Sequence, residues 1–354
     1  MRKVFIYLYL KPVSAYVKNF AESIVVNELQ YNSCCKHSVR KHVKMLVKCG
    51  IVLLTLAQAY NGSPLIRFRS DTEDNDNRVI EDRHDERCTK TVNDIFISVK
   101  TSGKFHQSRL TPILDTWFSL APSSTWIFSD TSDPDVTRRT EGHLIKTECP
   151  SDHSRTSLCC KMEAELTTFL TSDRSWFCHL DDDNYLNVPA LVKMLSSYSH
   201  KEEWYLGKAS ISAPLEMLDR SMLPEERKVS FLFGTGGAGF CLSRPLVERM
   251  GELVNNFAMT GDTIRLPDDV TVGYIAEVLM GVPLTQVETL HSHLEPLRRV
   301  DRDMLGEQIT LSYSVYEDGE RNVVGLKGID LERDPTTFYT IHCELFRGAS
   351  KTCG

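Results

Sequence analysis

Several features that would quickly assign a protein to a class are missing from this sequence. No two cysteines form a Cys-x-x-Cys pair, so the strongest sequence signature of a structural zinc site is missing. The net charge is −7, which leaves no basic excess for binding a polyanion, and we therefore expect no nucleic-acid partner. Internal repeats are also missing. The 354 residues are enough for one large domain or two ordinary ones.

The eleven cysteines are spread through the chain rather than crowded into one short segment. Disulfide bonds among them would indicate an oxidising compartment. Sequence alone leaves the connectivity open. Three pairs are candidates: Cys149 with Cys160, Cys178 with Cys241, and Cys343 with Cys353. Cys159 stands beside Cys160 and competes with it as the partner of Cys149.

The N-terminal part of the chain has the features of a targeting segment. Residues 1–44 are basic and irregular, and they form an extension whose translation depends on the start methionine. Residues 45–60 combine lysines with an apolar run, which predicts a signal peptide cleaved after Ala59 if translation starts at Met45. If it starts at Met1, the run is a signal-anchor, although it is short for a span of roughly 20 residues. An ordinary buried helix is the alternative.

Residues 61–92 are rich in charged and polar side chains and contain few apolar positions, which predicts a stem or linker. A cleaved signal peptide and a retained anchor would both deliver the following residues to the secretory lumen. We expect contact with a membrane only through the N-terminal segment, and only if that segment is retained.

Strand and helix patterns alternate from residue 94 onward. This alternation predicts one α/β domain over residues 93–354, with a mixed, largely parallel sheet flanked by helices. The predicted strands are residues 94–100, 125–130, 143–149, 176–180, 204–208, 229–233 and 240–243. The predicted helices are residues 157–170, 188–198 and 266–281, and a loop is predicted between residues 208 and 229.

An acidic triplet, Asp181, Asp182 and Asp183, follows the apolar strand at 176–180. Adjacent carboxylates repel one another and resist burial, so the fold must supply a counter-charge. Carboxylate oxygens suit Mg²⁺ or Mn²⁺, often together with a phosphate-bearing substrate. Ligands of open α/β sheets bind beyond the carboxyl ends of the strands, where this triplet is expected. The alternative is a solvated acidic turn that caps the next helix.

A glycine-rich run, GTGGAG, at residues 234–239 satisfies the G-x-G-x-x-G pattern of dinucleotide-binding proteins. The residues after it, FCLS, predict a strand, whereas the dinucleotide fingerprint requires a helix there, so we reject that assignment. Two interpretations remain open. The glycines let the backbone approach a ligand, or they form a plain tight turn.

Three further motifs contain candidate site residues, each with a structural alternative. In LPDD, Asp268 or Asp269 is either a helix N-cap or a positioned general base. In HSHLE, His291 and His293 share one face if the segment is extended, and one of them is either a metal ligand or a structural histidine. Arg109 follows a strand by a short loop and is either a phosphate or carboxylate contact or an exposed helix residue.

Taken together and in this order, the motifs resemble those of the Fringe family, the β-1,3-N-acetylglucosaminyltransferases that extend O-linked fucose on EGF-like repeats of Notch receptors. The resemblance spans residues 94–353, and it implies a GT-A fold and an inverting, metal-dependent transfer of GlcNAc from UDP-GlcNAc. It is carried by DIFISVKTSGKFHQSRL, WFCHLDDDNY, GTGGAGFCLSR, RLPDDVTVGYI, HSHLE and IHC.

The resemblance also implies roles for single residues. Asp182 is expected to contact the nucleotide sugar and Arg109 the donor. Asp183 and His293 are expected to bind Mn²⁺, and Asp269 is expected to be the catalytic base. The implied disulfides are Cys149–Cys160, Cys178–Cys241 and Cys343–Cys353. The implied location is the Golgi lumen, as a single-pass type II membrane protein or as a protein secreted after signal cleavage.

Two other functions remain in competition. The acidic triplet and the base would serve a β-1,3-glycosyltransferase that uses UDP-Gal or UDP-Glc equally well. A secreted glycan-binding module without activity is the second alternative, although such a module would not need the base.

Overall fold

The computed structural model describes three stretches of the chain, residues 91–219, 227–347 and 353. All of them belong to one compact unit, residues 84–354. The predicted extension at 1–44 and the predicted signal or anchor at 45–60 lie outside the described residues, as does all but the end of the predicted stem at 61–92. Within the described stretches, no helix is both long and apolar enough to cross a membrane.

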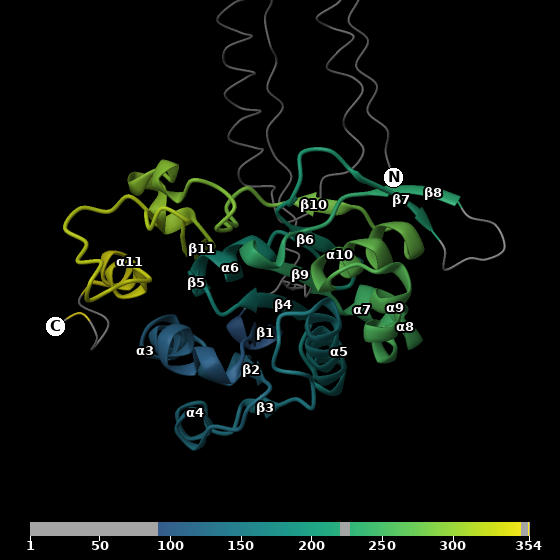
Figure 1. The fold of residues 1–354 in the computed structure, drawn as a ribbon, viewed down its shortest axis with the longest axis horizontal. Coiled ribbons are helices and arrows are strands. Elements are labelled where there is room, and N and C mark those ends of the chain that lie inside the picture. The colour runs from purple at the N-terminus through teal and green to yellow at the C-terminus, as the bar shows by residue number, and fades with distance from the viewer. Residues whose placement is uncertain (1–90, 220–226, 348–352, 354) are drawn as a thin grey trace, which may run out of the picture. The chain divides into compact units, whose positions relative to one another are not determined.

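A seven-stranded sheet forms the centre of the unit (Figure 1). Its strands lie in the order β10-β6-β9-β4-β1-β2-β3, and neighbours are parallel except where β9 is one of the pair. This sheet confirms the prediction of a mixed, largely parallel α/β domain. Its bounds are β1 Ile95–Lys100, β2 Thr125–Ser129, β3 Leu144–Lys146, β4 Trp176–Asp181, β6 Tyr205–Gly207, β9 Phe240–Ser243 and β10 Leu284–Gln286.

The other strands form small two-stranded sheets, in which β5 pairs with β11, β7 with β8, and β12 with β13. Their bounds are β5 Asn184–Leu186, β7 Leu215–Asp219, β8 Arg227–Phe231, β11 Thr310–Ser312, β12 Ser314–Val315 and β13 Arg321–Asn322. The α-helices are α3 Thr111–Asp115, α4 Pro134–Arg139, α5 Arg155–Thr171, α6 Val188–Leu195, α7 Arg244–Met250, α8 Glu252–Asn255, α9 Phe257–Ile264, α10 Asp268–Gly273 and α11 Phe338–Leu345.

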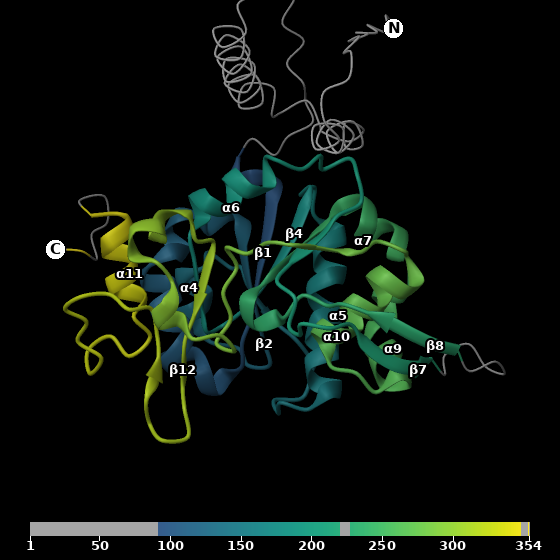
Figure 2. The same ribbon diagram turned by 90° about the horizontal axis from the view of Figure 1, so that it is seen from above.

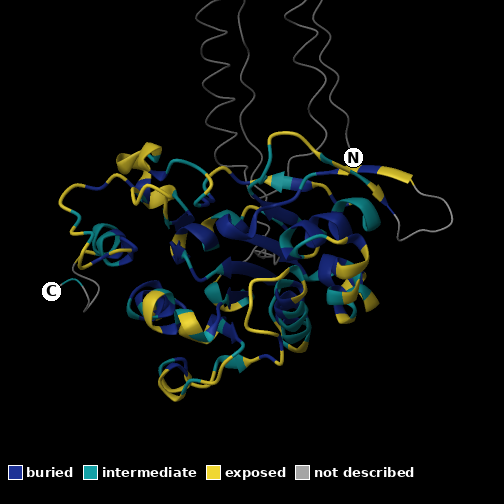
Figure 3. Cartoon of the chain, in the orientation of Figure 1, coloured by how far each residue is buried: buried dark blue, intermediate teal, exposed yellow. Residues whose placement is uncertain are grey.

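Helices cover both faces of the central sheet. Figures 1 and 2 show α6 and α11 on one side and α5, α7 and α9 on the other. The side chains of β1 alternate between the two layers, with Ile97 and Val99 in the first and Phe96 in the second. Strands β1 and β4 are buried on both faces (Figure 3). Their sequences therefore show continuous apolar runs rather than alternation.

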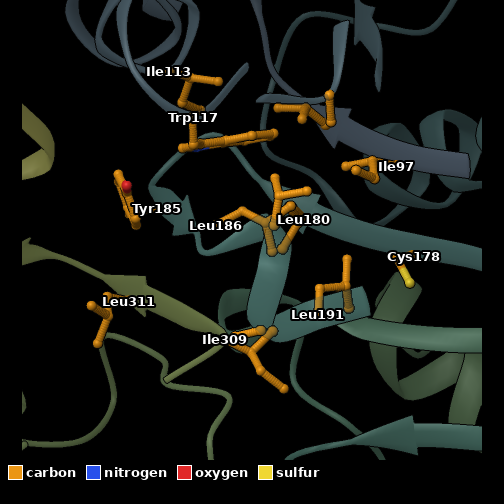
Figure 4. Close-up of a cluster of buried hydrophobic side chains, with 14 of the residues drawn as sticks. Ile97, Ile113, Trp117, Cys178, Leu180, Tyr185, Leu186, Leu191, Ile309 and Leu311 are labelled. Carbon is orange, nitrogen blue, oxygen red and sulfur yellow. The ribbon is translucent and has the colours of Figure 1, made fainter. Parts of the chain in front are cut away.

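A packed apolar cluster supports the end of β4, where the acidic triplet begins. Leu180, directly before Asp181, lies close to Trp117 and Leu186 in this cluster (Figure 4). The indole Nε1 of Trp117 donates a hydrogen bond to the carbonyl oxygen of Asn184 at 3.1 Å. The turn that carries the aspartates is thus held at its start by the packing of Leu180 and at its end by the hydrogen bond to Asn184.

Several predicted elements agree with the structure in place but differ in length. The helix predicted at 157–170 is α5, and the helix predicted at 188–198 ends earlier, as α6. The predicted strand at 143–149 is reduced to β3. The helix predicted at 266–281 is divided into α10 and a π-helical segment, Tyr274–Leu279.

The loop predicted between residues 208 and 229 was wrong in part. Strand β7 lies within this predicted loop and pairs antiparallel with β8, with Leu215 opposite Phe231 and Asp219 opposite Arg227. The strand predicted at 229–233 overlaps β8. The alternation of β7 is hidden in the sequence because Leu218, on its solvent side, is apolar and half exposed.

The glycine-rich run forms a short 3₁₀ turn, Gly236–Ala238, and leads into β9. The rejection of the dinucleotide-binding assignment is therefore confirmed, because a strand follows the glycines. Gly236 and Gly237 line a cavity, and Gly239 has a backbone φ of +79°. The run is both a tight turn and a cavity wall, and a close approach of its backbone to a ligand stays a prediction.

Gly239 cannot be replaced without strain. Its φ of +79° and ψ of 156° favour glycine, and an added Cβ would lie 2.7 Å from Leu180 Cδ2. We expect Gly239→Ala to lower the free energy of unfolding by about 1–3 kcal/mol in denaturant titrations. Gly306→Ala is the matched control, because an added Cβ there would meet nothing within 4 Å. Equal stability of the two variants would contradict this prediction.

All three predicted disulfides are confirmed: Cys149–Cys160, Cys178–Cys241 and Cys343–Cys353. The choice between Cys159 and Cys160 is settled because these neighbours lie on different sides of α5. Cys159 is buried and is the one free cysteine of the described residues, with its Sγ 3.6 Å from the carbonyl oxygen of Leu266. Burial raises the pKa of its thiol to about 12, which keeps it protonated.

Candidate active site

Strands β1 and β4 lie side by side and end at the same cavity, whose volume is about 470 Å³. Lys100 ends β1, Asp181 ends β4, and both line this cavity. The position is the one where open α/β sheets bind ligands. The five residues predicted to perform the chemistry all line it: Arg109, Asp182, Asp183, Asp269 and His293.

The three carboxylates of the acidic triplet have different partners. Asp181 Oδ1 lies 3.1 Å from Lys100 Nζ. Asp182 accepts hydrogen bonds from Thr101 Oγ1 at 2.7 Å and from Arg109 Nη1 at 3.0 Å. Asp183 Oδ1 is buried without a hydrogen-bond partner in the described residues. The solvated-turn alternative is wrong, because the side chains of Asp182 and Asp183 are only 6% and 14% exposed.

Arg109 reaches the cavity from a π-helical turn, His106–Leu110. Its guanidinium lies over the ring of Phe105, 3.9 Å from the centroid, and donates to Asp182. Stacking on Phe105 and the ion pair with Asp182 hold the side chain in one orientation. The exposed-helix alternative for Arg109 is therefore wrong, and the side chain is placed to meet a phosphate or carboxylate in the cavity.

Asp183 and His293 face each other, with Oδ2 of the aspartate 3.7 Å from Nδ1 of the histidine. Asp183 Oδ1 and His293 Nδ1 are buried, and neither has a hydrogen-bond partner in the described residues. Burial and the charges of Asp181 and Asp182 together raise the pKa of Asp183 to about 8. Burial lowers the pKa of His293, which favours the neutral imidazole. Such a pair fits a divalent cation, which would replace the proton on the carboxyl group.

The protein side chains alone do not complete a metal site. In the part of the chain that the structure describes, no three Asp, Glu, His or Cys side chains are grouped to hold an ion. Hard divalent cations commonly take their remaining ligands from substrate phosphates and water. A two-residue set is therefore compatible with an ion that binds together with a diphosphate.

The two histidines of HSHLE do not share a site. His291 does not line the cavity, and its Nε2 lies 2.8 Å from Gln308 Oε1 while its Nδ1 lies 3.2 Å from Glu295 Oε1. The segment is irregular rather than a strand, so the condition for a common face of the two histidines is not met. His291 is structural, whereas His293 faces the cavity, and its role as a metal ligand stays a prediction.

Asp269 projects into the cavity from the first turn of α10. Its Oδ2 accepts a hydrogen bond from the backbone N–H of Gly236 at 3.1 Å, and its Oδ1 accepts one from Val270 at 2.8 Å. Burial and the adjacent carboxylate of Asp268 together raise the pKa of Asp269 to about 6. A positioned carboxylate with this pKa is suited to accept a proton near neutral pH.

Neither acid of LPDD is a helix N-cap. Pro267 occupies the N-cap position of α10, and no side chain makes a capping hydrogen bond there. The N-cap interpretation was therefore wrong. Asp268 instead forms a buried ion pair with Lys100, and Asp269 is left to face the cavity.

A family model described as Fringe-like matches residues 90–349 of this chain. The chain belongs to the Fringe family. Over 258 residues it is 50% identical to the Fringe glycosyltransferase of Drosophila melanogaster, a match that covers 72% of this chain and 62% of that protein. It is 47% identical to the β-1,3-N-acetylglucosaminyltransferase lunatic fringe of Bos taurus, covering 73% of this chain and 68% of that protein.

These Fringe relatives are glycosyltransferases by name, which supports glycosyltransferase activity for this chain. The match spans less than two thirds of the Drosophila protein. Among solved structures, the mannose-1-phosphate geranyltransferase from Thermus thermophilus matches at 12% identity and a TM-score of 0.28, covering 56% of this chain and 70% of that one. A score this low supports no conclusion about fold or function.

Three charged residues of this Fringe-family site were not predicted from the sequence. Lys100 lies between Asp181 and Asp268, while His179 and Glu165 lie directly behind Asp181. Lys100 was read only as the end of a predicted strand, and His179 as part of an apolar run. A charged residue at the last position of a buried strand was the one available signal.

Proposed function

We propose that this chain transfers GlcNAc from UDP-GlcNAc in β-1,3 linkage to O-linked fucose on EGF-like repeats, in a metal-dependent, inverting reaction that modulates Notch signalling. One observation carries the proposal. A single cavity contains Asp269, a carboxylate suited to accept a proton, together with Asp183 and His293. The last two side chains face each other, and Asp183 Oδ1 and His293 Nδ1 have no hydrogen-bond partner in the described residues. Membership of the Fringe family supports the donor and acceptor classes.

Asp183 and His293 would hold Mn²⁺, because their buried oxygen and nitrogen atoms have no other partner in the described residues. When bound, the ion supplies Lewis-acid assistance to the departure of UDP. Arg109 and Asp182 would contact the donor from the neighbouring wall of the cavity. In this arrangement the diphosphate would bind beside Arg109 and the metal ligands, and the acceptor would bind beside Asp269.

Asp269 would accept the proton from the 3-hydroxyl of fucose as that oxygen attacks the anomeric carbon. The new carbon–oxygen bond forms while the bond from the anomeric carbon to the diphosphate breaks, and UDP leaves with the electron pair. A single displacement inverts the configuration at the anomeric carbon. No covalent glycosyl-enzyme is formed, so the reaction needs no protein nucleophile.

Transfer assays with the purified chain test this function. The acceptor is an O-fucosylated EGF-like repeat, and the donors are UDP-GlcNAc, UDP-Gal and UDP-Glc, with Mn²⁺ and then with EDTA. We expect product from UDP-GlcNAc alone, and only with metal. Product from UDP-Gal or UDP-Glc instead would favour the second glycosyltransferase hypothesis. A folded protein that binds UDP and gives no product with any donor would favour the binding module.

We also propose that the catalytic part acts in the Golgi lumen, either anchored as a type II membrane protein or released. The three disulfides support an oxidising compartment. N-terminal sequencing of secreted material tests the signal peptide. A start at Tyr60 is expected if cleavage follows Ala59, and an uncut N-terminus on membrane-bound material would favour the anchor.

The reaction should depend on pH through Asp269. Because burial raises the pKa of this carboxyl group to about 6, more than half of it is protonated below that pH and cannot accept a proton. We expect kcat at saturating Mn²⁺ and donor to fall roughly tenfold per pH unit below pH 6 and to level off above it. UDP binding measured at the same pH values separates this effect from donor loss. A flat profile between pH 5 and 7 would exclude Asp269 as the titrating base.

A further inference from the structure

Five charged or titratable side chains form a chain of contacts behind the cavity. In order they are Glu165 on α5, His179 and Asp181 on β4, Lys100 on β1, and Asp268 on α10. Glu165 and His179 are fully buried, and the side chains of Lys100 and Asp268 are 10% and 6% exposed. Buried charges are costly, and replacing them with apolar residues is often neutral or stabilising. Stability alone therefore does not account for these five buried or nearly buried groups.

Lys100 is the member that joins two separate parts of the site. Its ammonium group lies 3.1 Å from Asp181 Oδ1 and 2.5 Å from Asp268 Oδ2. Asp181 directly precedes the residues that face the donor and the metal, and Asp268 directly precedes the base. One cation thus holds the end of β4 and the start of α10 at a fixed separation.

The contacts behind Asp181 hold it in place. His179 Nε2 lies 3.4 Å from Asp181 Oδ1, and His179 Nδ1 lies 2.6 Å from Glu165 Oε2. Glu165 Oε2 also accepts a hydrogen bond from Ser98 Oγ at 2.7 Å. These contacts therefore connect Lys100, through Asp181 and His179, to Glu165 on the long helix α5, which packs against the sheet.

The glycine turn joins the same two parts on the cavity side. A Cβ at Gly236 would lie 3.4 Å from Asp181 Oδ2 and 3.7 Å from Asp269 Cβ, and the backbone N–H of Gly236 donates to Asp269. Asp181 and Asp269 therefore both lie close to one residue that has no side chain. A shift of α10 relative to β4 would disturb this contact and the position of the base.

We propose that Lys100 is a positioning residue that ties α10 to β4 and so fixes the distance between the catalytic base and the donor. The inference rests on the proposed function. Lys100 accepts no proton and forms no bond in the reaction. Reacting groups lose about 10²-fold in rate when misplaced by about 1 Å, so the loss of this tie should reduce kcat more than donor binding.

The groups that face Asp269 come from several elements. They are Asp268 on its own helix, Lys100 at the end of β1, Asp181 and His179 on β4, and Tyr205 on β6. Lys100 is the cation closest to the two flanking carboxylates. Without it, Asp268 loses its cation and Asp181 keeps only His179, so the two carboxylates disfavour the ionised form of the base more strongly.

The test compares Lys100→Met with the wild-type chain in steady-state transfer assays and pH profiles. We expect kcat to fall by about 10–100-fold, the KM for UDP-GlcNAc to change less than about threefold, and the acid limb of kcat to move to higher pH. Lys161→Met is the matched control for the pH limb. Lys161 is similarly buried and pairs with Asp130 at 2.7 Å, but it does not contact Asp268. In Lys161→Met, the pH below which kcat falls should be the same as in the wild-type chain.

Asp268→Asn covers the case in which Lys100→Met does not fold. This variant removes the ion pair between Lys100 and residue 268, while Asp181 remains paired with Lys100. No buried carboxylate therefore loses its cation. We expect the same fall in kcat with little change in KM. Two results would overturn this inference and leave the proposed function intact. One is a wild-type kcat in Asp268→Asn, and the other is a folded Lys100→Met whose kcat falls at the same acidic pH as that of the wild type. A wild-type chain that transfers no sugar would overturn the proposed function, and this inference with it.

Discussion

Replacing Asp269 by asparagine should lower kcat by about 10²–10⁴-fold. The carboxylate is the group in the cavity that is placed by two backbone N–H donors and has its pKa raised to about 6. Asparagine keeps the size and can still accept a hydrogen bond from Gly236, but it cannot take a proton from the acceptor hydroxyl. The loss should therefore appear in kcat, measured in transfer assays at saturating donor and Mn²⁺.

Two controls separate loss of the base from loss of the fold or the donor. UDP binding by calorimetry should stay within about threefold of wild type, because Asp269 belongs to the acceptor side of the proposed site. Asp262→Asn, at an exposed aspartate on the neighbouring helix α9, should leave kcat unchanged. If Asp269→Asn turns over at the wild-type rate, another group accepts the proton.

Replacing His293 by alanine should weaken Mn²⁺ binding at least tenfold and make activity depend on higher metal concentrations. The structure leaves Nδ1 of this histidine buried and unpaired beside Asp183, and an alanine would leave the aspartate as the single protein ligand. Mn²⁺ binding in the presence of UDP is measured by the electron paramagnetic resonance of the free ion. Asp183→Asn should have an effect of similar size.

His291→Ala is the matched control for the metal site. It removes a histidine of the same motif that contacts Gln308 and Glu295 and does not line the cavity. Its Mn²⁺ titration should coincide with that of wild type. An unaltered titration for His293→Ala, or an equal shift for His291→Ala, would remove His293 from the ligand set.

The local sequence pattern predicted most of the fold because the elements near the site are regular. The apolar run of β4 ends abruptly at the acidic triplet, and the prediction of a ligand site at that strand end agrees with the cavity found there. Strand β7 was missed because an apolar residue, Leu218, lies on its exposed side, whereas β8 overlaps the strand predicted at 229–233. The alternation that identifies a half-buried strand was therefore absent.

The electrostatics of the site could not be predicted from the motifs alone. The counter-charge expected for the acidic triplet comes mainly from protein cations, since Lys100 and Arg109 pair with Asp181 and Asp182. The third carboxylate, Asp183, lies farther from Arg109, at 3.9 Å, and its Oδ1 has no hydrogen-bond partner in the described residues, so it is the carboxylate that we propose for the metal ion. These pairs join residues more than 60 positions apart in the chain, so no local pattern reveals them.

The choice within each ambiguous motif also depended on tertiary contacts. Asp268 and Asp269 are adjacent acids with equal propensity for a helix start, yet one is buried against Lys100 and the other faces the cavity. The neighbouring cysteines Cys159 and Cys160 differ in the same way. Residues next to each other on a helix point about 100° apart, so the surrounding fold decides which of them is functional.

The central claim is that a single displacement, assisted by Asp269, transfers GlcNAc with inversion to the 3-hydroxyl of fucose. The most direct measurement is the nuclear magnetic resonance spectrum of the disaccharide product made from UDP-GlcNAc, whose donor sugar is α-linked. We expect GlcNAc in β linkage to carbon 3 of fucose. An α-linked product would require a second displacement or a different mechanism, and linkage to another carbon would contradict the proposed acceptor position.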